Sequence, residues 1–156
     1  MPADAASLSF APAGDDDFDA LLTLRMLAMH ESLQRLGRFD PQRARERLSR
    51  AFEPRHTRHI LQAGERMGFV VVLPEPGQWV LDHLYIAPAA QRRGIGSWVL
   101  AQVLAEADSQ RVPVAVTALR LSDANRFYQR HGFVLQSQQA WDLHYVRPVG
   151  GAHDAR

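Results

Sequence analysis

Apolar residues at helical spacing alternate with short apolar runs along this chain, and their order predicts its elements. In turn we expect a strand over 8–11, a helix from 15 to about 37, a helix that begins at 40–41 and is closed by Pro54, strands over 57–62, 67–73 and 79–86, a helix over 94–107, a strand over 112–117, a helix over 123–130 and strands over 133–138 and 141–146. This β-α-α-β-β-β-α-β-α-β-β order predicts one α/β domain of the mixed α+β kind, which we place at 7–147 with 1–6 and 148–156 as flexible tails.

The predicted helix starts carry side chains suited to capping. Asp15 can cap the first helix, and the carboxylates after it suit the positive end of the helix dipole, so we interpret the run Asp15–Asp17 as structural rather than as a metal cluster. Asp40 is the expected N-cap of the second helix, with Pro41 as its first residue. At the fourth helix we expect Asp123 or Ser122 as the cap.

Composition removes several chemistries. Among 156 residues there is no Cys, which excludes disulfides, thiol nucleophiles and Cys-containing zinc sites, and all 18 basic residues are Arg, which excludes a Schiff-base or P-loop lysine. The net charge of +1 draws the chain to neither nucleic acid nor membrane. Residues 35–58 carry eight Arg against three acidic residues, a solvated helix face or a site for an anionic partner. Without an apolar span or a signal-peptide pattern, we expect a cytoplasmic protein.

Two motifs carry most of the functional information. Gln91-Arg92-Arg93-Gly94-Ile95-Gly96 follows a predicted strand and opens a helix, and such a turn suits an anion because backbone N–H groups and the helix dipole point at it. About thirty residues later stand Asn125-Arg126-Phe127-Tyr128 and Gly132-Phe133. Together the two motifs strongly resemble the acetyl-CoA-binding signatures of GCN5-related N-acetyltransferases (GNAT).

The resemblance implies a mostly antiparallel seven-stranded sheet flanked by helices, splayed after the strand that ends at Ile86, with acetyl-CoA as co-substrate in the splay. Tyr128, the final residue of the second motif, would protonate the departing thiolate. The family often has an Asn seven residues before this Tyr, where this chain has Leu121, so Asn125 takes its place as the predicted coenzyme contact. The coenzyme-binding residues that the resemblance implies are Leu84, Tyr85, Ile86, Gln91, Arg92, Arg93, Gly94, Ile95, Gly96, Ser97, Asn125 and Tyr128.

Amide formation requires an uncharged amine, so a base is expected near the thioester. Asp82 and His83 stand together in an otherwise apolar strand, and because neighbouring strand residues point to opposite faces, one of them at most faces the reacting groups. Asp82, acting through water, is the first choice and His83 the alternative; a buried structural role is open for both. His30, Glu31 and Arg38 lie where the resembled family shapes its acceptor pocket.

The remaining signals favour structural roles. His56 and His59 lack a third ligand, so we predict no metal site, and Trp79, Trp98 and Trp141 are expected in the core. The sequence therefore predicts an acetyl-CoA-dependent N-acetyltransferase that acts directly on a primary amine of a small molecule, with no nucleic-acid or membrane partner and a homodimer as one possible assembly. The alternatives are a peptide or protein acetyltransferase, acting on an N-terminus or Lys, a non-catalytic acetyl-CoA-binding module, and a nucleic-acid-binding protein.

Overall fold

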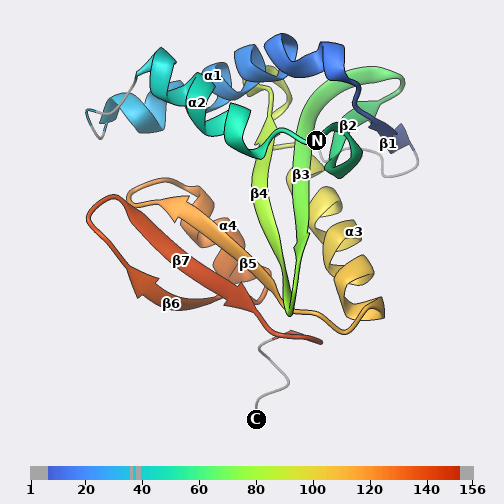
Figure 1. The fold of residues 1–156 in the computed structure, drawn as a ribbon, viewed down its shortest axis with the longest axis vertical. Coiled ribbons are helices and arrows are strands. Elements are labelled where there is room, and N and C mark those ends of the chain that lie inside the picture. The colour runs from blue at the N-terminus through green and yellow to red at the C-terminus, as the bar shows by residue number, and fades with distance from the viewer. Residues whose placement is uncertain (1–6, 36, 38–39, 152–156) are drawn as a thin grey trace. The chain divides into compact units, whose positions relative to one another are not determined.

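A computed structural model describes residues 7–35, 37 and 40–151, and its elements follow the predicted order (Figure 1). The predicted positions Leu36 and Arg38 and the terminal segments 1–6 and 152–156 lie outside the described residues. None of the described helices is long and apolar enough to cross a membrane. The elements are β1 (Leu8–Pro12), η2 (Asp15–Asp17), α1 (Phe18–Arg35), α2 (Pro41–Ala51), η3 (Pro54–His56), β2 (Thr57–Gln62), β3 (Glu65–Glu75), β4 (Gln78–Ile86), η4 (Pro88–Ala90), α3 (Ile95–Ser109), β5 (Val114–Leu119), α4 (Ala124–Arg130), β6 (Val134–Gln138) and β7 (Asp142–Arg147).

The seven strands form a sheet in the order β1-β2-β3-β4-β5-β7-β6. The pairs β1/β2, β2/β3, β5/β7 and β6/β7 are antiparallel, whereas β4 and β5 are parallel. The predicted mostly antiparallel seven-stranded sheet is therefore confirmed. The parallel pairing joins Trp79–Leu81 to Val114–Val116, although β4 itself continues to Ile86.

Two compact units make up the chain, and each is built from separate stretches. The first unit contains the residues up to Val72 together with His83–Val99, and the second contains Leu73–Asp82 and the residues from Leu100 onward. Strands β3 and β4 and helix α3 thus pass from one unit into the other.

In the first unit, α1 and α2 lie side by side (Figure 1). Leu22 is buried as the helical spacing predicts, but Met26 and Met29 are only half-buried, and the buried face of α1 instead includes Leu21 and Arg25. Arg25 follows Leu21 by four residues and Leu22 by three, which places all three on one side of the helix. A basic residue in this face was not predicted, because the periodicity argument followed apolar residues alone.

The start of the first helix differs from the prediction. Gly14, not Asp15, is the N-cap of the short helix η2, and the Asp17 carboxylate accepts hydrogen bonds from the Gly14 amide at 2.7 Å and from His59 Nε2 at 3.0 Å. These partners, the Gly14 amide first, hold the pKa of Asp17 below its usual range. The acidic run is structural at Asp17, as expected, but its partner His59 comes from β2 and is remote in sequence.

The other two predicted caps have opposite outcomes. Asp40 caps α2 as predicted, since its Oδ1 accepts from the amides of Gln42 at 3.0 Å and Arg43 at 3.3 Å. At α4 neither predicted side chain caps: Asp123 occupies the N-cap position without a side-chain bond, and the buried Ser122 hydroxyl has no hydrogen-bond partner within the described residues. Asp123 has helical dihedral angles (φ −67°, ψ −18°), whereas a capping side chain needs extended backbone.

In the second unit, β5 begins two residues later than predicted. The Val112 amide donates to Ala107 O at 3.0 Å, so Val112 still closes the end of α3, and Pro113 O accepts from the Trp79 amide at 2.9 Å. The expectation that Trp141 belongs to the core is wrong, because its side chain, just before β7, is 43% exposed. It lies in the connection after β6, an edge strand whose five residues are all exposed.

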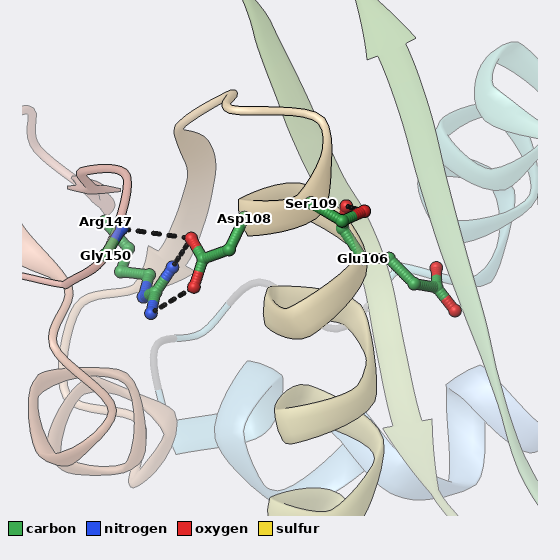
Figure 2. Close-up of polar contacts among 5 residues, drawn as sticks. All are labelled: Glu106, Asp108, Ser109, Arg147 and Gly150. Atoms are coloured by element: carbon green, nitrogen blue, oxygen red, sulfur yellow. Dashed lines mark hydrogen bonds and ion pairs between the residues drawn. The ribbon is translucent and has the colours of Figure 1, made fainter.

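An ion pair joins the end of α3 to the end of β7 in this unit (Figure 2). Arg147 donates from Nη1 to Asp108 Oδ1 at 2.6 Å and from Nη2 to Oδ2 at 3.1 Å, and the Gly150 amide donates to Oδ1 at 3.0 Å. The hydrogen bonds from Arg147 hold the pKa of Asp108 below its usual range. The turn after β7 is therefore tied to α3 by a charged, two-pronged contact.

Asp108→Asn is expected to lower the free energy of unfolding by about 2 kcal/mol at pH 7, because it removes the charge from these hydrogen bonds. A carboxyl whose pKa is lowered by folding stabilises the protein above its unfolded-state pKa and loses that contribution as the pH falls through the folded-state value. The difference between the two proteins should therefore shrink below pH 3.8. Urea unfolding followed by Trp fluorescence measures it. Asp19→Asn, which breaks the exposed pair with Arg45, is the control and should change stability little.

Candidate active site

The predicted anion-binding turn is braced by its own side chains. Gln91 Nε2 donates to Ile86 O at 3.0 Å, which ties the turn to the end of β4. Arg93 donates to Ala89 O at 3.1 Å and to Gln62 Oε1 at 3.3 Å, so its guanidinium holds the turn to β2. Arg92 makes no such contact in the described structure and is exposed. Of the two predicted arginines, Arg93 therefore supports the turn and Arg92 remains available to an anion.

The backbone of this turn is shaped for close approach. Both Arg92 (φ +66°) and Gly94 (φ +81°) are left-handed, a conformation that costs a non-Gly residue about 1–2 kcal/mol. A Cβ added at Gly94 would meet nothing within 4 Å, so the space over the turn is open. The first bond of α3 runs from the Trp98 amide to Gly94 O at 3.1 Å, and amides before it point out of the helix end. This geometry suits a phosphate group.

The buried anchor of the turn is Ile95, which is 1% exposed, while Gly96 and Ser97 are partly exposed in the first turn of α3. Before the turn, Leu84, Tyr85 and Ile86 form the end of β4 and are half-buried. They lie beyond the part of β4 that pairs with β5. The predicted coenzyme residues from 84 to 97 thus belong to the first unit and follow one another directly.

His83 and Asp82 lie on opposite faces of β4, as their adjacency requires. His83 is 2% exposed, and its ring lies 5.5 Å from that of Tyr85. Arg47 of α2 donates from Nη1 to His83 Nε2 at 3.4 Å. A guanidinium only donates, so the Nε2 lone pair of His83 is engaged by Arg47. Asp82 is half-buried and belongs to the second unit.

Arg25 adds a second guanidinium to the Tyr85 side of β4. Its Cζ lies 5.5 Å from the centroid of the Tyr85 ring, and the side chain is 8% exposed. Sequence reasoning missed this residue. Its spacing from the apolar positions of α1 was the available signal, because it placed an Arg within a buried face.

The second unit carries Tyr128 and Asn125 on α4. Tyr128 is 7% exposed, and its ring packs edge-on against those of Phe127 and Phe133 at 5.3 Å. Asn125 Nδ2 donates to the carbonyls of Leu119 and Ser122, both at 2.9 Å.

The other polar end of Asn125 is also engaged, since its Oδ1 accepts from the Tyr145 hydroxyl at 2.9 Å. With both N–H groups used, the second lone pair of Oδ1 is what the side chain still offers a ligand. The coenzyme contact of Asn125 stays a prediction, and the structure adds a role in holding the turn before α4.

The described structure shows no cluster of the histidines weighed as metal ligands, and it places only part of the predicted acceptor pocket. His30 is exposed at the end of α1, and the structure does not describe the side chain of Glu31. His59 is bound to Asp17, as described above. Among the described residues, no three His, Asp or Glu side chains come together as a metal site requires.

The model of a protein family described as an acetyltransferase (GNAT) domain matches residues 55–135, just over half of the chain. No curated protein is similar enough in sequence to count as a relative.

Solved structures of similar fold include the PaiA N-acetyltransferase of Thermoplasma acidophilum in complex with coenzyme A, at 12% identity and TM-score 0.74, covering 91% of this chain and 99% of that one. An acetyltransferase of Thermus thermophilus has 22% identity, TM-score 0.71 and coverage of 91% and 97%. The ribosomal-protein-S18-alanine N-acetyltransferase of Escherichia coli has 14% identity, TM-score 0.68 and coverage of 91% and 94%.

Proposed function

The chain belongs to the GNAT acetyltransferase family, whose co-substrate is acetyl-CoA, and on that premise we propose that it transfers the acetyl group directly to a primary amine of a small molecule. Membership of the family makes the chain an acetyl-CoA-dependent acyltransferase. The identity of the acceptor is what we propose. The observation that carries the proposal is the braced, left-handed turn at residues 91–94 leading into α3. Since strands β3 and β4 and helix α3 pass from one unit into the other, we treat both units as one acetyltransferase domain.

We assign the coenzyme to the residues that the sequence predicted. The turn amides and the start of α3, from Gln91 to Ser97, bind the pyrophosphate, with Arg92 as the exposed charge beside it. The backbone of Leu84–Ile86 pairs with the pantetheine arm as an added strand would, because it lies past the part of β4 that pairs with β5. The bound coenzyme supplies an activated acetyl thioester.

Direct transfer is the route that the chain's residues support. Without Cys, and without a Ser placed by either motif, the chain offers no nucleophile for an acyl-enzyme. The acceptor amine must lose a proton, and Asp82 is our choice to receive it through water. His83 is the weaker choice because Arg47 occupies its Nε2 lone pair. Tyr128 then supplies a proton to the departing sulfur.

A thiol-release assay tests the function. The protein is incubated with acetyl-CoA and polyamines, aminoglycosides, amino acids and short peptides, and free thiol is read with a colorimetric disulfide reagent, to which a Cys-free chain adds no background. Release with a small amine above the no-amine control supports the proposal. Release with peptides alone would instead make this a peptide or protein acetyltransferase. Coenzyme binding without release from any amine would make it a binding module.

Gly94→Ala is expected to weaken acetyl-CoA binding about tenfold, which corresponds to about 1.4 kcal/mol. The added Cβ enters the open space over the turn and strains a backbone at φ +81°. Gly77→Ala is the matched control, because Gly77 has φ +84° and equally open space in the β3–β4 hairpin. Both variants should lose similar stability, while only the first loses affinity in calorimetric titration with coenzyme A. Equal affinities would show that the turn does not hold the pyrophosphate.

We retain two further expectations from the sequence. The cytoplasmic location rests on the composition, and the homodimer rests on the resemblance to the family; size-exclusion chromatography with light scattering tests the second. Nucleic-acid binding through the Arg-rich helix α2 is disfavoured by its contacts, since Arg45 pairs with Asp19 and Arg47 with His83. Such binding would be steeply dependent on salt.

A further inference from the structure

Arg25 is a permanent positive charge buried in the first unit. The side chain is 8% exposed, and its Nε and Nη1 atoms are buried without a hydrogen-bond partner within the described residues. An arginine side chain does not give up its proton in proteins. Burying a charge without a partner is costly, and proteins pair such groups or use them to bind ions. The described residues leave the charge of Arg25 uncompensated.

The groups that the described structure records beside Arg25 are aromatic or basic. Its guanidinium lies over the Tyr85 ring at 5.5 Å, a favourable cation–π contact that leaves its N–H groups without acceptors. Beside Tyr85, the His83 ring lies at 5.5 Å and accepts a hydrogen bond from Arg47 at 3.4 Å. Two guanidinium groups, those of Arg25 and Arg47, therefore contact side chains on this face of β4.

Three carboxylates at the starts of the first two helices have other partners. Asp17 binds His59 at 3.0 Å, and Asp19 pairs with Arg45 at 3.1 Å. Asp40 is used to cap α2. Within the described residues, no acceptor reaches Arg25 Nε or Nη1, and a ligand can supply the anion.

We propose that the acceptor is an amine that also carries a carboxylate, such as an amino acid, and that Arg25 binds this carboxylate. This inference rests on the proposed function and names its substrate class. A carboxylate matches the planar fork of a guanidinium with two parallel hydrogen bonds. Because Arg25 is almost fully buried, a compact ligand suits it better than a side chain on a folded protein. Tyr85, under Arg25, belongs to the stretch assigned to the pantetheine arm, so the acceptor lies beside the coenzyme. With the acceptor on this face of β4, the base that faces it is His83, the alternative to Asp82, because Asp82 points to the opposite face.

The experiment compares amino acids with their carboxamides in the thiol-release assay. The unmodified protein should prefer the acid, and Arg25→Gln should raise KM for the acid about tenfold or more while leaving kcat/KM for the amide nearly unchanged. Arg25→Lys should recover part of the loss, because it restores the charge without the fork. The matched control is Arg45→Gln, which removes an arginine over an aromatic ring at a similar distance, 5.4 Å from Phe18, but at an exposed position. It should leave the preference intact.

Two further measurements separate substrate binding from other roles. The Kd for coenzyme A should be the same in Arg25→Gln and the unmodified protein; a weaker Kd would mean that Arg25 binds a coenzyme phosphate. The melting temperature of ligand-free Arg25→Gln should not fall, because the substitution removes an unpaired buried charge. A marked fall would show a structural role instead, and a kcat loss equal for acid and amide would show a role in the reaction.

Failure of the inference differs from failure of the proposed function. Turnover with amides as good as acids, or a preference for phosphorylated amines, would overturn the carboxylate assignment and leave the acetyltransferase intact. The absence of thiol release with every amine tested would overturn the proposed function. In that case, amino acids at millimolar concentration should still raise the melting temperature of the unmodified protein and not of Arg25→Gln. The absence of that difference would overturn the inference as well.

Discussion

Tyr128→Phe is expected to lower kcat about 100-fold with the best acceptor, which is the low end of what a general acid contributes. The substitution removes the hydroxyl and keeps the ring, so the contacts with Phe127 and Phe133 persist and the fold is preserved. The Kd for coenzyme A should remain near the unmodified value. Steady-state kinetics and calorimetric titration measure the two quantities. Unchanged turnover would remove Tyr128 from the acid role.

Tyr145→Phe is the matched control for this experiment. Tyr145 is also a buried tyrosine of the second unit, and its hydroxyl donates to Asn125 Oδ1 at 2.9 Å. Its loss should cost about 1 kcal/mol of stability, the usual contribution of one such hydrogen bond. Because this hydroxyl holds structure and is assigned no proton transfer, kcat should stay close to that of the unmodified protein. A drop as large as that of Tyr128→Phe would indicate a general loss of order around α4.

Gly68→Ala is expected to destabilise the protein by about 3 kcal/mol, at the upper end of the usual cost of overpacking, and to abolish measurable coenzyme binding. A Cβ at this β3 position would overlap the Tyr85 carbonyl oxygen of β4 and lie 3.1 Å from Ile86 Cδ1. Backbone atoms cannot move aside as a flexible side chain does. The strand would have to shift at the very residues to which we assign the pantetheine arm.

Gly14→Ala provides the control for Gly68→Ala. Gly14 has an ordinary negative φ of −113°, and a Cβ there would meet Asp17 Oδ2 at 3.8 Å, a normal van der Waals distance. Urea unfolding should therefore show little change for Gly14→Ala and a large one for Gly68→Ala. If Gly68→Ala unfolds and binds coenzyme like the unmodified protein, then β3 and β4 do not approach as closely as described.

The elements whose signals are local were predicted well. Asp40 caps α2 as expected, because an N-cap bonds to amides two and three residues away and needs nothing from the rest of the fold. The turn Gln91–Gly96 was predicted for the same reason, because its glycines and the start of the helix lie in consecutive residues. Strand β5 was misplaced by two residues, because the end of α3 engages Val112.

Contacts between residues remote in sequence could not be predicted from these local signals. Asp17 was expected to serve its own helix, and it also holds His59, 42 residues away. Asn125 was expected to meet the coenzyme, and much of its hydrogen-bonding capacity is used within its own unit. The importance of Gly68 could not be predicted from its neighbours in sequence. A side chain is excluded there because the Tyr85 carbonyl oxygen of the next strand lies too close.

By itself, the sequence determined the order of elements, the family, the glycine-rich turn before α3 and the absence of a thiol nucleophile, all of which depend on residue type and short spacing. The tertiary structure decided that Arg25 is buried over Tyr85, with Nε and Nη1 unpaired within the described residues, and that Arg47 engages His83. Whether a charge is buried, and whether it is paired, depends on neighbours from several elements. The periodicity along a single helix gives no information about those neighbours. The proposed carboxylate of the acceptor is argued from those neighbours, so that inference required the folded chain.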